Sequence, residues 1–525
     1  MTRRISVSAT LAVSALACAL GGLATPAVAK VTKLDIISKD SFGTFKPGEY
    51  VWWQGRISGE LSPTEKIPDL DRAAKNARGM VEYSAKISLM FAKNPKDGNG
   101  TLLVDIPNRG RVYAQALYNS PRDEPFESGT AEVGTGFLQD HGFAIAEVMW
   151  ELGQGANLPT FDETSGKKHF VEGVGFAIVR DATDFLRNAS ADSLGAPNPL
   201  HGAIKHVLAS GKSQSGRYLK TFLYNGFNMA DGRRVIDGMH VFVSGAGMLP
   251  IMQSGTGPKS SATGAPDFAD PEFPGVHDSV LTIGEIIKKV KERGEKPPLM
   301  LMISSTTDFY SLRASLGRTG GEGGTTDLPL PPNVRMYDIA GASHAILLKA
   351  KCDLPMAKLD WSPVSRATLL HLNDWVTKDI NPPPSRLMPL EPATGDKTVL
   401  QAPKNLPKAV IEIPKRDADG NAIGGVRLPD EQVPLGVNAQ QNPPLSFACM
   451  LGGAYVAFPR TQADADARHD SHKPVLERYK TRNDYVNQVR IAARDLEHDG
   501  FLLPDDAAII IQSAAESPLW RSREP

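Results

Sequence analysis

The stretch HVLASGKSQSGRYLK, residues 206–220, decides between two folds. Its Gly-Lys-Ser triplet is typical of the end of a phosphate-binding P-loop, whereas Gly-Lys-Ser-Gln-Ser is typical of the turn that carries a catalytic serine. A P-loop needs a further glycine five residues before the triplet, so that successive backbone N–H groups converge on the phosphates. His206 occupies that position, which excludes the P-loop.

A nucleophile elbow needs small residues two positions before and two positions after its serine, because strand and helix approach closely at the turn. Around Ser213 these residues are Gly211 and Ser215. Around Ser215 they would be Ser213 and Arg217, and the long side chain of Arg217 fits such a turn poorly. We therefore predict a strand, a tight turn and a helix, with Ser213 at the tip of the turn.

Composition excludes several classes of partner. The 525 residues are 41% apolar, which is typical of a soluble globular protein with one large elaborated domain or two to three smaller ones. The formal net charge is −1, and the sequence has neither a basic stripe nor an acidic tail. We therefore expect no nucleic-acid partner and no binding to a membrane surface.

The N-terminal segment has the pattern of a secretory signal peptide. Arg3 and Arg4 precede an apolar run over residues 5–23, and a small-x-small triplet ends at Ala29. We predict that residues 1–29 are removed and that the mature protein is secreted or periplasmic, with a membrane anchor as the alternative. Removal leaves 56 basic and 59 acidic residues, a net charge of −3. The paired arginines leave Sec and twin-arginine export open.

Two cysteines stay in the predicted mature chain, Cys352 and Cys449. In an oxidising compartment they either form a disulfide or remain two buried free thiols, and the sequence leaves both possibilities open. Cys18 lies in the signal segment, and the third residue before it is Ala15 and not the leucine expected of a lipoprotein.

Apolar runs alternate with helical patterns over residues 30–394. We expect an antiparallel opening to a sheet, followed by a mostly parallel sheet with helices on both faces, which is an α/β fold. The predicted buried strands are residues 102–106, 143–150, 204–209, 235–243, 299–303 and 334–339.

Two further segments interrupt or extend this pattern. Residues 250–280 are rich in Gly, Ser and Pro, and we interpret them as an insertion over the site or as a plain surface loop. Residues 395–525 are predicted to form a C-terminal extension packed on the main domain. Its last part has a helical pattern that ends at Gly500, and Pro504 begins a second helix.

A serine hydroxyl needs a base within hydrogen-bond reach and an acid that orients the base. His344 follows the strand predicted at 334–339 and is the candidate base. Asp308 follows the strand at 299–303 and is the candidate acid, with Asp327 and Asp338 as competitors. The other downstream histidines lie in a strand, in the insertion, in a helix or in the extension: His240, His277, His371, His469, His472 and His498.

Two backbone N–H groups are needed to stabilise a tetrahedral oxyanion. The first is expected from Gln214, which follows the nucleophile and opens the predicted helix. The second is expected from Asn108, Arg109 and Gly110, in the loop after the strand at 102–106. The alternative for this loop is a simple turn.

Seven motifs resemble a branch of the α/β-hydrolase superfamily described as α/β-hydrolase domain-containing proteins, and the resemblance covers most of the mature chain. They are PNRGR (107–111), GFAIAEVMWELG (142–153), GKSQSGR (211–217), SSTTDF (304–309), AGASHA (340–345), LLHLNDWVTKDINPPPSR (369–386) and LERYKTRNDYVNQVRIAARDLEHDGFLLPDDA (476–507). The resemblance implies an α/β-hydrolase fold and a triad of Ser213, Asp308 and His344. The family more often has glutamate where this chain has Asp308.

The leading functional hypothesis is a secreted serine hydrolase that cleaves small-molecule carboxylic esters through an acyl-enzyme, with no metal and no organic cofactor. An amidase, a lactonase or an acyltransferase would use the same triad, so these activities are alternatives. A non-catalytic binding protein on a hydrolase scaffold is the hypothesis from another class.

Overall fold

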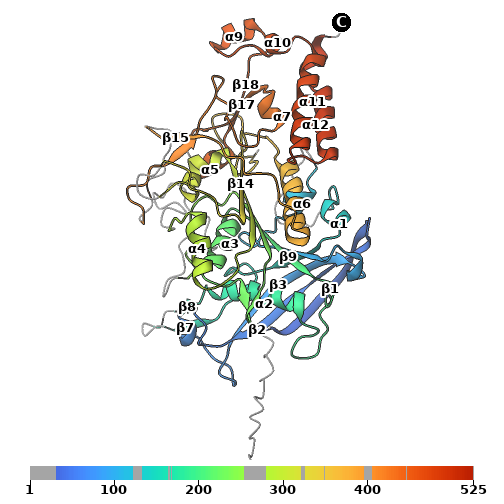
Figure 1. Cartoon of the computed structure of the whole chain (residues 1–525), viewed down its shortest axis with the longest axis vertical. Helices are drawn as coiled ribbons and strands as arrows, with labels where there is room; N and C mark the ends of the chain where they lie inside the picture. The colour runs from blue at the N-terminus through green and yellow to red at the C-terminus, as the bar shows by residue number, and fades with distance from the viewer. Residues whose placement is uncertain are drawn as a thin grey trace, which may run out of the picture.

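The structure is a computed structural model of the whole chain (Figure 1). It describes residues 31–523 except 122–132, 163–165, 167, 253–278, 321–324, 348, 395–401, 403–404 and 445. The predicted signal peptide, residues 1–29, lies outside the described residues. So does almost all of the insertion predicted at 250–280.

A sheet of ten strands forms the centre of the molecule, in the order β1-β2-β3-β5-β4-β9-β12-β13-β14, with β6 paired to β3. Strands β1 to β3 are antiparallel and join β5 in the antiparallel direction, whereas β5, β4, β9, β12, β13 and β14 run parallel. The strands are β1 Val31–Phe45, β2 Gly48–Leu61, β3 Val81–Ala92, β4 Thr101–Asp105, β5 Ala144–Val148, β6 Ala156–Asn157, β9 His206–Lys212, β12 Gly238–Phe242, β13 Leu299–Ser305 and β14 Val334–Ile339.

The two faces of the sheet enter two different hydrophobic clusters. On β4, Leu102 and Val104 belong to one cluster and Leu103 to the other, as the two-residue period of a strand requires. Helices α2 (Val174–Asn188), α3 (Gln214–Tyr224) and α4 (Ile283–Glu292) cover the first face, and α6 (Ser362–Lys378) covers the second (Figure 1). The predicted α/β architecture, a mostly parallel sheet with helices on both faces, is confirmed.

Shorter elements connect these layers. The helices are α1 Phe137–Asp140, α5 Thr306–Ser311, α7 Pro429–Gln432, α8 Phe447–Gly452, α9 Gln462–Arg468 and α10 Val475–Arg478. Three-residue to six-residue turns of 3₁₀ or π type lie at Leu70–Arg72, Pro95–Asp97, Gln115–Asn119, Ala314–Gly317 and Pro518–Arg523. The short strands are β7 Thr160–Asp162, β8 Lys168–Phe170, β10 Met229–Ala230, β11 Arg233–Arg234, β15 Leu390–Pro392, β16 Glu412–Pro414, β17 Gly436–Gln440 and β18 Ala454–Ala457.

The C-terminal segment contributes directly to the second face of the core. Helices α11 (Arg482–His498) and α12 (Pro504–Glu516) pack against each other, at the end of the molecule opposite the first strands (Figure 1). Val489 of α11 and Leu372 of α6 belong to the same hydrophobic cluster. Arg366 of α6 donates from Nε to Oδ2 of Asp506 at 3.0 Å, and both residues are buried. The boundary at residue 394 stays a prediction, since one core continues across it.

A disulfide joins Cys352 to Cys449 in the structure, with their Cα atoms 5.8 Å apart. Cys352 follows the segment that contains His344, and Cys449 lies in α8. The bond therefore fastens α8 beside the loop after β14, across a sequence separation of 97 residues. No helix in the described ranges is long and apolar enough to cross a membrane.

Replacement of both cysteines by serine is expected to lower the free energy of unfolding by roughly 2–4 kcal/mol, because the cross-link restricts the unfolded chain. Urea denaturation followed by tryptophan fluorescence measures this difference. Reductant should lower the stability of the wild type to that of the double variant. Two titratable thiols in the denatured, unreduced wild type would contradict the bond.

Candidate active site

Ser213 lies at a sharp turn between β9 and α3. Its backbone has φ 60° and ψ −115°, a conformation that is strained for a residue with a side chain. A Cβ on Gly211 would lie 2.5 Å from the Ser215 carbonyl oxygen, and a Cβ on Gly216 would lie 2.7 Å from Cβ of Ser244. The turn therefore requires Gly211, as predicted, and Gly216, which the sequence argument missed.

The two neighbouring serines have different environments. Ser213 is half-buried at the tip of the turn, whereas Ser215 is fully buried as the second residue of α3. The Ser215 hydroxyl has no hydrogen-bond partner within the described part of the chain. Of the two, Ser213 is the serine that a bound molecule can reach.

Asp308 and His344 meet in a buried hydrogen bond. His344 Nδ1 lies 2.7 Å from Asp308 Oδ1, and the relative exposure of the two residues is 4% and 0%. The second carboxylate oxygen of Asp308 accepts the backbone N–H of Ser305 at 2.7 Å, as part of the capping box of α5. With the carboxylate as acceptor, Nδ1 carries the proton and Nε2 keeps its lone pair. The short aspartate side chain is thus long enough to reach His344.

The parallel strands place these residues at the same end of the sheet, where the carboxyl ends of the strands lie. Ser213 follows β9, Asp308 follows β13 and His344 follows β14, and all three strands are parallel. Both Ser213 and His344 are described residues, and no hydrogen bond joins them in this structure. Such bonds are often long in the absence of substrate.

The competing acids are engaged elsewhere. Asp338 is buried and pairs with Arg318 Nη1, and Asp327 Oδ1 lies 2.8 Å from Arg318 Nε. Burial raises the pKa of Asp338 while the nearby Arg318 opposes the shift. Neither carboxylate contacts His344. Both Asp327 and Asp338 are instead partners of the same arginine, Arg318.

His240, one of the other downstream histidines, is a core residue. Its Nδ1 lies 2.9 Å from the Tyr118 hydroxyl, and its Nε2 lies 3.1 Å from the Thr368 hydroxyl. Burial lowers the pKa of His240 to about 3, which keeps the ring neutral. His277 lies outside the described residues.

The loop that carries His344 is fixed by residues that the sequence argument missed. The backbone N–H of His344 donates to Thr307 Oγ1 at 2.7 Å and to the Leu451 carbonyl at 3.1 Å. Thr307 Oγ1 in turn donates to the Leu451 carbonyl at 2.9 Å, and Trp361 Nε1 donates to the Ser343 carbonyl at 3.1 Å. Leu451 comes from α8, so the C-terminal segment supports the loop.

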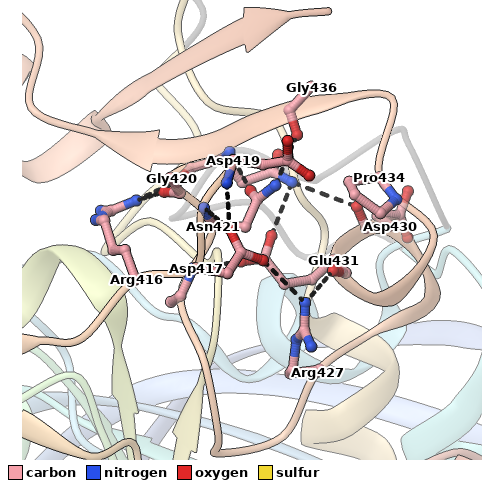
Figure 2. Close-up of polar contacts among 12 residues, drawn as sticks. Arg416, Asp417, Asp419, Gly420, Asn421, Arg427, Asp430, Glu431, Pro434 and Gly436 are labelled. Atoms are coloured by element: carbon pink, nitrogen blue, oxygen red, sulfur yellow. Dashed lines mark hydrogen bonds and ion pairs between the residues drawn. The ribbon is translucent and has the colours of Figure 1, made fainter. Parts of the chain in front are cut away.

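Glu431 of α7 supports the same loop from another side. It is fully buried; its Oε1 accepts the N–H of Ala422 and its Oε2 accepts Asn438 Nδ2, both at 2.9 Å. Figure 2 shows Glu431 within a polar network in which Arg427 donates to the backbone carbonyl of Glu431 and pairs with the carboxylate of Asp417. A Cβ placed on Gly341, three residues before His344, would overlap Glu431 Oε2.

The predicted oxyanion loop forms a tight turn beside Ser213. Asn108 N–H donates to the Arg111 carbonyl at 2.8 Å, and Arg109 and Gly110 have φ of 51° and 73°. Asn108 Nδ2 donates to the Lys212 carbonyl at 2.9 Å, which fastens the turn to β9. Because the turn uses the N–H of Asn108, the donors that remain are those of Arg109 and Gly110.

Gln214 begins α3, directly after Ser213. Its side chain is held by a buried hydrogen bond from Nε2 to Glu151 Oε1 at 2.9 Å. The backbone N–H of Gln214 belongs to the first turn of α3, where N–H groups have no partner within the helix.

The cationic side chain of Lys212 lies between two aromatic rings beside the turn, which sequence reasoning did not anticipate. Lys212 Nζ lies 5.3 Å from the ring centroid of Tyr113 and 5.4 Å from that of Trp361. Burial lowers the pKa of Lys212 to about 8, and the charge of Asp308 opposes this shift. The sequence did contain a signal for this position of Lys212. Side chains alternate between the two faces along β9, and this alternation turns Lys212 toward the face covered by α6.

In the described ranges, no group of three or more His, Cys, Asp or Glu side chains is placed to hold a metal ion.

Comparison with known proteins identifies a family. A family model described as "Alpha/beta hydrolase domain" matches residues 57–512. No curated protein matches the chain.

Solved structures give weak likenesses. A putative acetyl xylan esterase from Bacteroides fragilis is 11% identical with a TM-score of 0.28, over 58% of this chain and 70% of that one. S-formylglutathione hydrolase from Staphylococcus aureus is 8% identical with a TM-score of 0.23, over 48% and 77%. A CE15 glucuronoyl esterase from Teredinibacter turnerae is 11% identical with a TM-score of 0.23, over 42% and 47%.

Gly341→Ala is expected to lower the free energy of unfolding by roughly 2–5 kcal/mol. The positive φ of +72° costs an alanine about 1–2 kcal/mol, and overlap with Glu431 adds about 1–3 kcal/mol. Gly294→Ala is the matched control, because Gly294 has φ +75° and nothing within 4 Å of a Cβ. Thermal and urea denaturation compare the two variants, and equal losses would contradict a role for Glu431 in fixing the loop.

Proposed function

We propose that this chain, which belongs to the alpha/beta hydrolase domain family, cleaves carboxylic esters of small molecules with Ser213 as nucleophile. The observation that carries the proposal is the buried hydrogen bond between Asp308 and His344, at the sheet edge where Ser213 sits on its strained turn. Serine, acid and histidine follow one another in the order typical of this fold.

The proposed reaction has two halves. His344 Nε2 takes the Ser213 proton while the hydroxyl attacks the ester carbonyl, and the resulting imidazolium returns that proton to the departing alcohol. Water then attacks the acyl-enzyme with His344 again as base, which releases the carboxylic acid and restores Ser213. Asp308 stays ionised, holds the proton on Nδ1 and stabilises the imidazolium.

The oxyanion that forms in each half needs donors aimed at it in advance. We assign this role to the N–H of Gln214, at the positive end of α3, and to the N–H of Arg109 or Gly110. The hydrogen bond from Asn108 to the Lys212 carbonyl supports this assignment, because it holds the turn beside Ser213.

We place the enzyme in the periplasm or outside the cell. The signal-peptide pattern of residues 1–29 supports this location, and so does the Cys352–Cys449 bond, which persists in an oxidising compartment.

A fluorophosphonate probe tests the nucleophile. The wild type is expected to gain one adduct, mapped to Ser213, and Ser213→Ala should lose both the label and hydrolysis of a chromogenic ester panel. Ser215→Ala is the matched control and should keep the label. Labelling of Ser215 in the Ser213→Ala variant would refute the assignment.

Asp308→Asn is expected to reduce kcat by roughly 10³–10⁴, because an amide in place of the carboxylate favours the wrong tautomer of His344. Asp327→Asn is the control, since Asp327 pairs with Arg318 and not with His344. Steady-state kinetics on one ester measures both, and a similar kcat for Asp308→Asn and the wild type would assign the acid elsewhere.

A further inference from the structure

Lys212 immediately precedes Ser213 and places a cation inside the candidate site. Its side chain is half-buried between two aromatic rings, with Nζ 5.3 Å from the Tyr113 centroid and 5.4 Å from the Trp361 centroid. Trp361 is itself tied to the site, because its Nε1 donates to the carbonyl of Ser343, the residue before His344. The ammonium thus belongs to the residue next to the proposed nucleophile and lies over a ring that is hydrogen-bonded to the loop of the proposed base.

This ammonium has no protein anion of its own. Within the described residues, Lys212 Nζ takes part in no hydrogen bond and no ion pair. Asp308 is near enough to act on Lys212 through its charge, but its two oxygens already accept from His344 and Ser305. The rings of Tyr113 and Trp361 attract a cation but cannot accept a strong hydrogen bond.

Leaving a half-buried ammonium without an acceptor costs free energy, because burial removes water that is not replaced by a partner. The cost is visible in the lowered pKa of Lys212. A folding role does not explain the residue, since an apolar side chain would pack between two aromatic rings at no such cost. An anion delivered by a ligand would supply the missing partner.

A second cation, Arg109, lies in the turn that is fastened to the carbonyl of Lys212. Arg109 is half-buried in the turn after β4, and no ion pair involves it in the described part of the chain. Its charge also reaches Arg217 in the first turn of α3, where it lowers the pKa of that guanidinium further. The hydrogen bond from Asn108 to the Lys212 carbonyl joins the turn that carries Arg109 to the strand that carries Lys212. Two cationic residues are therefore carried by the two segments that meet beside the nucleophile.

We propose that Lys212, assisted by Arg109, makes this site selective for esters that carry a carboxylate close to the scissile bond. The inference rests on the proposed function and adds a substrate class to it. Lys212 binds the carboxylate through a charge-assisted hydrogen bond, and Arg109 adds attraction at longer range.

Two pairs of esters test the selectivity, with the charge placed on either side of the bond. The first pair is 3-acetoxybenzoate, with the carboxylate on the alcohol part, and its neutral counterpart 3-acetoxybenzamide. The second pair is monophenyl adipate, with the carboxylate on the acyl part, and its neutral counterpart phenyl heptanoate. For at least one pair, the wild type should show kcat/KM about tenfold or more higher for the anionic ester, as a charge-assisted bond provides. Glutarate should inhibit more strongly than glutaramide.

Lys212→Met should reduce that ratio of kcat/KM values about tenfold and weaken inhibition by glutarate, whereas Lys212→Arg should retain most of both. Lys39→Met is the matched control, because Lys39 lies over the Trp53 ring at 4.1 Å on β1, at the far edge of the sheet. It should leave the ratio unchanged. Thermal denaturation checks that each variant is folded.

The outcomes separate the two proposals. Hydrolysis by the wild type without preference for either anionic ester overturns this inference alone, and so does a Lys212→Met variant that loses activity equally on both members of each pair. That equal loss would mean that Lys212 supports the triad residues and does not bind the substrate carboxylate. A wild type that takes no fluorophosphonate label and hydrolyses none of the esters contradicts the proposed function itself.

Discussion

The site depends on one strained turn. Ser213 adopts a backbone conformation that costs about 1–3 kcal/mol for a residue with a side chain, and the surrounding packing must hold it there. Two contacts do so. The Ser213 N–H donates to the Phe242 carbonyl at 2.9 Å, and Gly216 lets α3 approach the same end of β12. Most residues of β9 and α3 are buried, so the packing around both elements keeps the turn in this conformation. The Ser213 hydroxyl therefore stays at the carboxyl end of β9.

The sequence predicts those features of the fold and the site that depend on contacts between nearby residues. The elbow, the strand alternation and the loops after strands depend on residues a few positions apart, and those expectations agree with the observed sheet. Gly216 was missed because its neighbour is Ser244, which lies in the loop after β12 on another part of the chain. Asp308 could be ranked above Asp338 only by placement, whereas the decisive fact is the partner Arg318, twenty residues before Asp338.

The C-terminal segment was expected to be an extension packed on the main domain. Its contacts show that it also supports the loop that carries His344. Leu451 accepts hydrogen bonds from His344 and Thr307, and Glu431 fills the space beside Gly341. The disulfide to Cys352 holds α8 in place for this purpose. These contacts span from about 90 to more than 140 residues of sequence, which no periodicity or spacing could reveal. The position of His344 is therefore a property of the whole chain, not of the motif that contains it.

A positive charge near the nucleophile has opposite effects on substrate binding and on catalysis. It attracts an anionic substrate, but it also repels the positive charge that forms on His344. A cation at Lys212 would repel the imidazolium that forms on His344 during attack. Asp308 compensates, since it contacts His344 directly and Lys212 only through its field. A carboxylate on the substrate would shift this balance further, because it neutralises Lys212 and leaves the charge of Asp308 to act on the imidazolium alone. In such a site an anionic substrate would help to stabilise the imidazolium that forms while Ser213 attacks the ester, so binding and catalysis would favour the same ester.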